Sequence, residues 1–163
     1  SASKGFDDFI KLNKLLDPAQ YDITLIGLND ELIKALPEGI TGIKRTQSVK
    51  ELASYYTAAS VFVNPTYSDN YPTTNLEAMA CGTPVITYKT GGSPEAITPE
   101  TGLVVEQGDI EALVEAIKEV CTNGKKHYFE ACRTRAVEHF DKRKCYAKYI
   151  ELYKELLTKK TDK

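Results

Sequence analysis

The segment from Val61 to Thr87, VFVNPTYSDNYPTTNLEAMACGTPVIT, constrains the fold more than any other part of the chain. Its first residues are β-branched or aromatic and end at Asn64, which predicts a short strand. After a polar loop, Pro72 is tolerated in the first turn of a helix, and Gly82 supplies a left-handed stop. Residues 84–87 predict the next strand. A strand, a helix and a second strand in this order are typical of parallel sheets.

The same segment carries almost no charge. Charged residues make up 27% of the chain, yet Asp69 and Glu77 are the only ones between Glu51 and Lys89, where average composition predicts about ten. Asp69 falls in the loop after the first strand, and Glu77 about one turn into the helix. Parallel α/β sheets bind ligands at this edge, beside free backbone N–H groups. The alternative is that both carboxylates are ordinary solvated surface groups.

Helical and strand patterns alternate along the rest of the chain. Strands are predicted at 22–28, 40–44 and 102–105, and helices at 4–16, 30–36, 48–59, from 93, at 109–123 and from 126 onward. Such alternation predicts an α/β fold in which a parallel sheet is covered by helices on both faces, followed by C-terminal helices. Right-handed crossovers would make it a Rossmann-like sandwich.

Individual residues mark some of the helices. Ser48 with Glu51 three residues later predicts a capping box, and Asp109 is placed to cap the helix that follows it. Tyr55 and Tyr56 are predicted to be packing residues, as aromatic residues in helices usually are.

Composition excludes several classes of function. The 163 residues suffice for one domain with a real core. The formal net charge of -2 argues against a nucleic-acid partner, and no apolar run reaches the roughly 20 residues of a membrane helix. The four cysteines form no CxxC pair, which argues against a zinc site and favours reduced thiols. No D-x-D metal motif is present either.

Three motifs together resemble a known family. Asp69, seven intervening residues and Glu77 followed by AMACGTPVI resemble the E-x7-E segment of retaining glycosyltransferases of the family 4 type. The sequence GGSPE at 91–95 matches the loop that comes next in that family, and TGLVV at 101–105 with Gly108-Asp109 matches the strand and helix start beyond it. The motifs keep their order and spacing over most of the chain. The resemblance implies the donor-binding C-terminal half of a GT-B fold.

The resemblance also implies which residues would hold a nucleoside-diphosphate sugar. Glu77 would accept hydrogen bonds from the ribose hydroxyls. Lys4 and the backbone amides at Thr73 and Thr74 would hold the diphosphate, and either threonine could also cap the helix. Taken alone, Lys4 would be interpreted as a solvated lysine.

The donor sugar is assigned to the loop before the helix, at Asp69, Asn70 and Tyr71. Here the chain departs from the family pattern, which usually places Glu at the first position and a glycine-flanked aromatic after it. The missing methylene shortens the reach of the carboxylate by about 1.3 Å, so the loop or the sugar must compensate. The departure bears on the identity of the sugar more than on the reaction class.

Contacts to the base or between backbone and donor are expected at Gly27, Gln47, Gly91 and Gly92. Glycine permits close approach of a ligand to the backbone, but a tight turn that only needs glycine explains each of the last two equally well. No catalytic residue, metal or cofactor is assigned to this part of the protein.

We expect residues 1–163 to be one domain of a longer protein. In the resembled family, a strand and a phosphate-contacting arginine directly precede the Lys-Gly pair found here at Lys4-Gly5, so both are expected to be missing together with an N-terminal acceptor domain. The acceptor, a glycan or a lipid-linked sugar, would bind that missing half, and the isolated piece would have little or no transferase activity. The family implies a cytoplasmic enzyme, at the inner membrane surface if the missing half binds there, and polysaccharide assembly is a common role.

Two other functions stay open. A nucleotide-sugar epimerase of the same fold would need acid and base groups near the sugar, yet His127 and His139 lie far along the chain from the motif loops. A non-catalytic nucleotide-binding module would not need Asp69 and Glu77 at this spacing.

Overall fold

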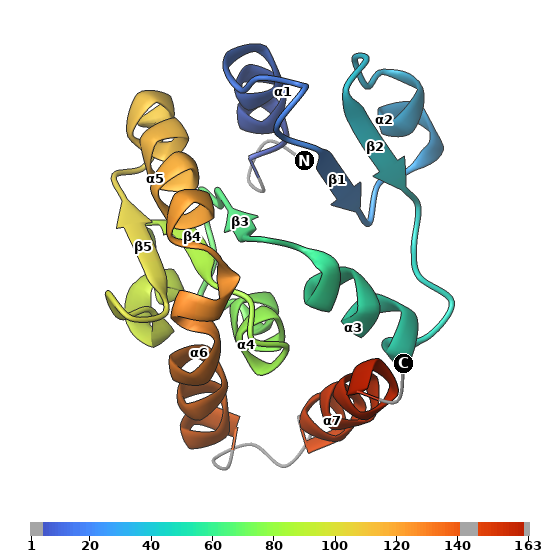
Figure 1. The fold of residues 1–163 in the computed structure, drawn as a ribbon. Helices are drawn as coiled ribbons and strands as arrows, with labels where there is room; N and C mark the ends of the chain where they lie inside the picture. The colour runs from blue at the N-terminus through green and yellow to red at the C-terminus, as the bar shows by residue number, and fades with distance from the viewer. Residues whose placement is uncertain (1–4, 141–146, 162–163) are drawn as a thin grey trace.

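The predicted alternation of strands and helices is present in the computed structural model, which describes residues 5–140 and 147–161 (Figure 1). The strands are β1 (Ile23–Ile26), β2 (Ile40–Ile43), β3 (Phe62–Asn64), β4 (Val85–Tyr88) and β5 (Gly102–Val105). The helices are α1 (Phe6–Leu15), α2 (Asp30–Lys34), α3 (Val49–Ala58), α4 (Thr73–Ala80), the 3-10 helix η2 (Ser93–Ala96), α5 (Ile110–Asn123), α6 (Lys125–Phe140) and α7 (Ala147–Thr161).

The strands form two parallel sheets, one of β1 and β2 and one with the order β3-β4-β5. In the larger sheet, Val85 pairs with Phe62 on one side and with Gly102 on the other. The sequence predicted a single sheet, but within the described residues β1 and β3 do not pair with each other. All strand pairs are parallel, so within each sheet the loops that follow the strands gather at one edge.

The predicted caps of α3 and α5 are confirmed. Ser48 Oγ accepts a hydrogen bond from the backbone N–H of Glu51 at 3.1 Å, and the Glu51 carboxylate accepts one from the backbone N–H of Gln47. Asp109 Oδ1 accepts from the backbone N–H of Ala112 at 3.0 Å. These short-range signals succeed because both partners of each bond lie within one turn of the same helix.

The core is built around β4, whose four side chains are all buried. Helix α4 packs against α3, α6 and α7, while α1 packs against α5. Figure 1 shows that α7, the last helix of the chain, lies next to α3. Helices α4 and α5 also contact strands of the larger sheet, which is therefore covered by helices, as the sequence predicted.

Candidate functional site

The candidate site is the carboxyl edge of the larger sheet, where the loop of residues 65–72 joins β3 to α4. Pro72 is the N-cap of α4, and within the described part of the chain no side chain caps the start of the helix. The expected cap by Thr73 or Thr74 is therefore wrong, because neither hydroxyl accepts from a backbone amide of this turn. An uncapped helix start keeps backbone N–H groups available to an anion.

Glu77 lies in the second turn of α4 and is half-buried. Its Oε2 accepts a hydrogen bond from the hydroxyl of Tyr56 in α3, at 2.9 Å. Burial raises the pKa of the Glu77 carboxyl above its ordinary value, and the bond from Tyr56 opposes that shift. Among the residues that the structure describes, Glu77 forms no ion pair, and its half-burial distinguishes it from an ordinary, fully solvated surface acid.

The 65–72 loop lies directly on the turn that contains Gly91 and Gly92. The backbone N–H of Gly92 donates to the carbonyl of Asp69 at 3.3 Å. A Cβ added to Gly91 would lie 2.0 Å from the Asp69 carbonyl oxygen, and one added to Gly92 would lie 1.9 Å from that of Asn70. A side chain at either position would clash with the facing loop, so the packing of the two loops requires both glycines. Their contact with a donor stays a prediction.

A buried acid in α1, which no sequence pattern indicated, also holds this loop. Asp8 is 2% exposed, and its Oδ2 accepts hydrogen bonds from Tyr67 Oη at 2.7 Å and Tyr88 Oη at 2.8 Å. Tyr67 belongs to the 65–72 loop and Tyr88 ends β4. The hydrogen bond to Asp8 raises the pKa of Tyr67, and burial, followed by that bond, raises the pKa of Tyr88. Asp8 therefore joins α1, β4 and the loop.

A second buried network links the ends of β3 and β4 to the starts of α4 and η2. Asn75, 1% exposed, accepts from Asn64 Nδ2 at 2.9 Å and donates to the carbonyl and hydroxyl of Ser93, each at 3.2 Å. The Thr87 and Ser93 hydroxyl oxygens lie 2.6 Å apart. Since every buried side-chain nitrogen or oxygen among the described residues has a partner, this network fixes the edge of the sheet firmly.

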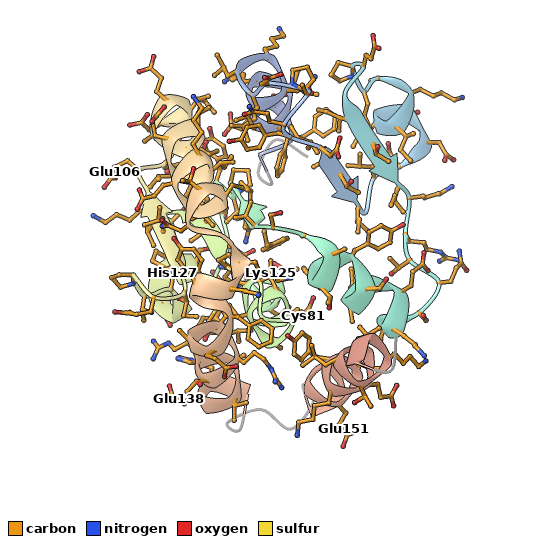
Figure 2. All side chains as sticks on the ribbon, in the orientation of Figure 1. Cys81, Glu106, Lys125, His127, Glu138 and Glu151 are labelled. Atoms are coloured by element: carbon orange, nitrogen blue, oxygen red, sulfur yellow. The ribbon has the colours of Figure 1, made fainter. Side chains whose placement is uncertain are left out.

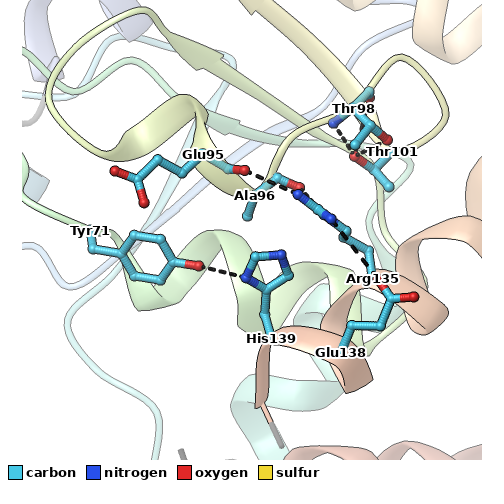
Figure 3. Close-up of polar contacts among 8 residues, drawn as sticks. All are labelled: Tyr71, Glu95, Ala96, Thr98, Thr101, Arg135, Glu138 and His139. Carbon is cyan, nitrogen blue, oxygen red and sulfur yellow. Dashed lines mark hydrogen bonds and ion pairs between the residues drawn. The ribbon is translucent and has the colours of Figure 1, made fainter. Parts of the chain in front are cut away.

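Tyr71, assigned to the donor sugar, contacts the end of α6. Its hydroxyl lies 3.1 Å from Nδ1 of His139, as Figure 3 shows. His139 is far from this loop along the chain, as the sequence shows, yet the fold brings the end of α6 into contact with it. In the same view, Arg135 donates to the carbonyls of Glu95 and Ala96 at the end of η2, each at 3.2 Å.

The other residues that were predicted to contact the donor lie in several separate parts of the structure. Gly27 follows β1 with a φ of 95°, and a Cβ built there would meet no atom of the described residues within 4 Å. Gln47 is exposed at the start of α3. Asp69 is half-buried, Asn70 is exposed, and Lys4 lies outside the described residues.

In the described part of the chain Cys81, Cys121 and Cys132 are free thiols, of which Cys81 and Cys132 are buried and Cys121 is half-buried. Burial raises the pKa of Cys81 to about 11 and that of Cys132 to about 12. Figure 2 places Lys125 close to Cys81, and the Lys125 ammonium donates to backbone carbonyls at the end of α3. Within the described ranges no group of three His, Cys, Asp or Glu side chains could hold a metal ion.

A family model described as glycosyl transferases group 1 matches residues 1–123 of the chain. The chain belongs to the group 1 glycosyltransferases. The D-inositol 3-phosphate glycosyltransferase of Kribbella flavida is 38% identical to it over 89 residues, which are 54% of the chain and 20% of that relative.

Solved structures agree with this family. The sucrose-phosphate synthase of Thermosynechococcus elongatus superimposes on this glycosyltransferase chain with a TM-score of 0.70 and 26% identity, covering 97% of the chain and 43% of the synthase. Anabaena Alr3699/HepE, solved in complex with UDP-glucose, gives a TM-score of 0.68 and 17% identity, covering 98% and 46%. The predicted family and Rossmann-like α/β fold are confirmed. The chain spans less than half the length of these proteins.

The glycosyltransferase chain contains no helix, among those the structure describes, that is long and apolar enough to cross a membrane. Sequence patterns do not indicate five residues of its site, and they predict only a packing role for Tyr56. The five residues are Asp8, Tyr67, Asn75, Tyr88 and His139. One signal was available for Asn75, since an amide on the buried side of a charge-free helix needs partners.

Proposed function

We propose that this chain is the donor-binding half of a glycosyltransferase that moves a sugar from a nucleoside-diphosphate sugar to an acceptor, with retention of configuration. The observation that carries the proposal is the Glu77 carboxylate. It is half-buried at the carboxyl edge of a parallel sheet, without an ion-pair partner among the described residues, and it accepts one bond from a neutral hydroxyl. A carboxylate in this position suits a vicinal pair of hydroxyl donors, as on ribose.

The other donor groups are assigned to the neighbouring loop and helix start. The diphosphate would lie at the uncapped amides of Thr73 and Thr74, together with Lys4, and the sugar would lie at Asp69, Asn70 and Tyr71. As the nucleoside diphosphate leaves, its growing negative charge would be stabilised by the helix amides and by that lysine. Family membership favours this function over the epimerase and over a non-catalytic module.

We also propose that a second domain supplies the acceptor site and that one further parallel strand lies between β1 and β3. Two features support this: the structural relatives are more than twice as long as the matched region, and the two parallel sheets would become one sheet on addition of such a strand. Little or no transfer by residues 1–163 alone is expected. A cytoplasmic location, and the absence of metal or cofactor from the reaction, belong to the same proposal.

Calorimetric titration with UDP, GDP and ADP tests donor binding and identifies the base. Glu77→Ala should abolish binding of the preferred nucleotide, because the ribose contact is lost. Asp69→Ala should leave that nucleotide unchanged and weaken only its sugar conjugate. Glu111→Ala, which removes an exposed acid of α5, is the matched control. Equal loss in Glu77→Ala and Glu111→Ala, or no binding by the wild-type chain, would contradict the proposal.

A turnover assay with the same nucleotide sugars tests the division between halves. Efficient transfer by residues 1–163 alone would show that the acceptor site is not on a second domain.

A further inference from the structure

Tyr56 is held in a fixed position from which its hydroxyl hydrogen-bonds to Glu77. Its side chain is 7% exposed, and its ring packs edge to face against Phe62 at the start of β3, with centroids 5.4 Å apart. Its backbone carbonyl accepts from Thr83 Oγ1 at 2.6 Å and from Lys125 Nζ at 3.4 Å. Backbone and ring are therefore both fixed, and the hydroxyl that projects from this ring meets Glu77 Oε2.

The two oxygens of Glu77 have different surroundings. Oε2 accepts from Tyr56, whereas Oε1 has no hydrogen-bond partner among the described residues. No buried side-chain oxygen in the described part of the chain lacks a partner, and Glu77 is not an exposed residue, so Oε1 must reach solvent. One oxygen of the carboxylate is thus accessible to solvent, while the other is hydrogen-bonded to Tyr56.

We propose that Tyr56 is a positioning residue for nucleotide binding: its hydroxyl orients the Glu77 carboxylate so that Oε1 faces the ribose diol of a nucleoside diphosphate. This inference rests on the proposed function, in which Glu77 binds the ribose. A free Glu side chain has rotatable bonds that must be ordered on binding, and a fixed donor behind it removes part of that cost.

The same bond also acts on the pKa of the Glu77 carboxyl. Burial raises the pKa of Glu77 and the Tyr56 hydroxyl lowers it, since a donor stabilises the charged form. Among the titratable groups of the surrounding helices, Cys81 at the end of α4 interacts with Glu77, and Lys125 and Arg133 on α6 interact with Cys81. Tyr153 on α7 is influenced by Arg133 and Cys81. Without the hydroxyl, the pKa of Glu77 should rise, and nucleotide binding should weaken at a higher pH than in the wild type.

The test compares Tyr56→Phe with Tyr55→Phe, a matched change at the preceding position of α3. Affinity for the preferred one of UDP, GDP and ADP is measured by calorimetry between pH 5 and 8. In the ligand-free protein, the Glu77 pKa is followed by the ¹³C carboxyl resonance, assigned by its loss in Glu77→Gln. Tyr56→Phe should weaken binding about tenfold near neutral pH, as expected for a hydrogen bond to a charged group. It should also move the midpoint of the pH profile and the Glu77 pKa upward.

Tyr55→Phe should change neither quantity. In a Glu77→Gln background, Tyr56→Phe should add much less than it does in the wild type, because the two residues act as one unit. An unchanged Glu77 pKa, an unchanged affinity, or additive effects would overturn the role of Tyr56 while the proposed function stands. No nucleotide binding by the wild-type chain would instead remove the proposed function and this inference with it.

Discussion

The buried carboxylate of Asp8 should contribute strongly to stability, and replacing it tests how the site is held. Asp8→Ala leaves the Tyr67 and Tyr88 hydroxyls without their acceptor. Tyr88 is fully buried, so its stranded hydroxyl costs about 1–3 kcal/mol, whereas Tyr67 is 36% exposed and can bond to water. With the two charge-assisted bonds lost as well, the free energy of unfolding should fall by about 2–4 kcal/mol.

Urea unfolding followed by circular dichroism measures this, with Asp7→Ala as the control because Asp7 is exposed in the same first turn of α1. The control should change the free energy of unfolding by no more than about 0.5 kcal/mol. In a double-mutant cycle, Asp8→Ala and Tyr88→Phe should couple by about 1–2 kcal/mol. Additive effects, or an Asp8→Ala loss no larger than that of Asp7→Ala, would refute the reasoning.

Three further predictions concern pH, packing and thiol chemistry. Burial raises the pKa of Glu77 in the folded state, so the stability that its protonated form contributes is fully present below the unfolded-state pKa of 4.5 and is lost as pH rises. Glu77→Gln should therefore unfold at a higher temperature than wild type at pH 7 but not at pH 4. Gly92→Ala, whose new Cβ would lie 1.9 Å from the Asn70 carbonyl oxygen, should cost about 1–3 kcal/mol in urea unfolding, and a neutral effect would show that the loop yields freely. Burial raises the pKa values of Cys81 and Cys132 to about 11 and 12, so at pH 8 both thiols should react with iodoacetamide only as fast as the protein opens. Peptide mapping measures the rate, and faster modification would contradict their burial.

The Tyr88 phenol gives an independent check of the Asp8 contacts at alkaline pH. Its pKa is raised above the ordinary 10.0, first by burial and then by the bond to Asp8, so the stability it contributes is present below pH 10 and is lost as pH rises further. In a spectrophotometric titration, Tyr88→Phe should remove one late-ionising phenol. Loss of an early-ionising phenol instead would show that Tyr88 is accessible.

The sequence by itself determined the order and type of the elements, the caps of α3 and α5, and the family. These depend on residues that lie close together in the chain. Ser48 and Glu51 are separated by less than one helical turn, so their bond can be predicted from spacing alone. The motif around Asp69 and Glu77 is equally local, and it located the carboxyl edge of the larger sheet.

Only the tertiary structure decided which polar side chains meet at the carboxyl edge of the larger sheet. Asp8 is separated by 59 positions from Tyr67 and by 80 from Tyr88, and Tyr71 by 68 from His139. Apolar periodicity predicts which face of an element is buried, but a hydrogen bond requires two atoms to lie within a few tenths of an ångström of a preferred distance. That placement depends on how helices pack across the sheet, which no local pattern specifies. The same limit explains why the sequence assigned Tyr56 to packing, while the fold also sets its hydroxyl against Glu77.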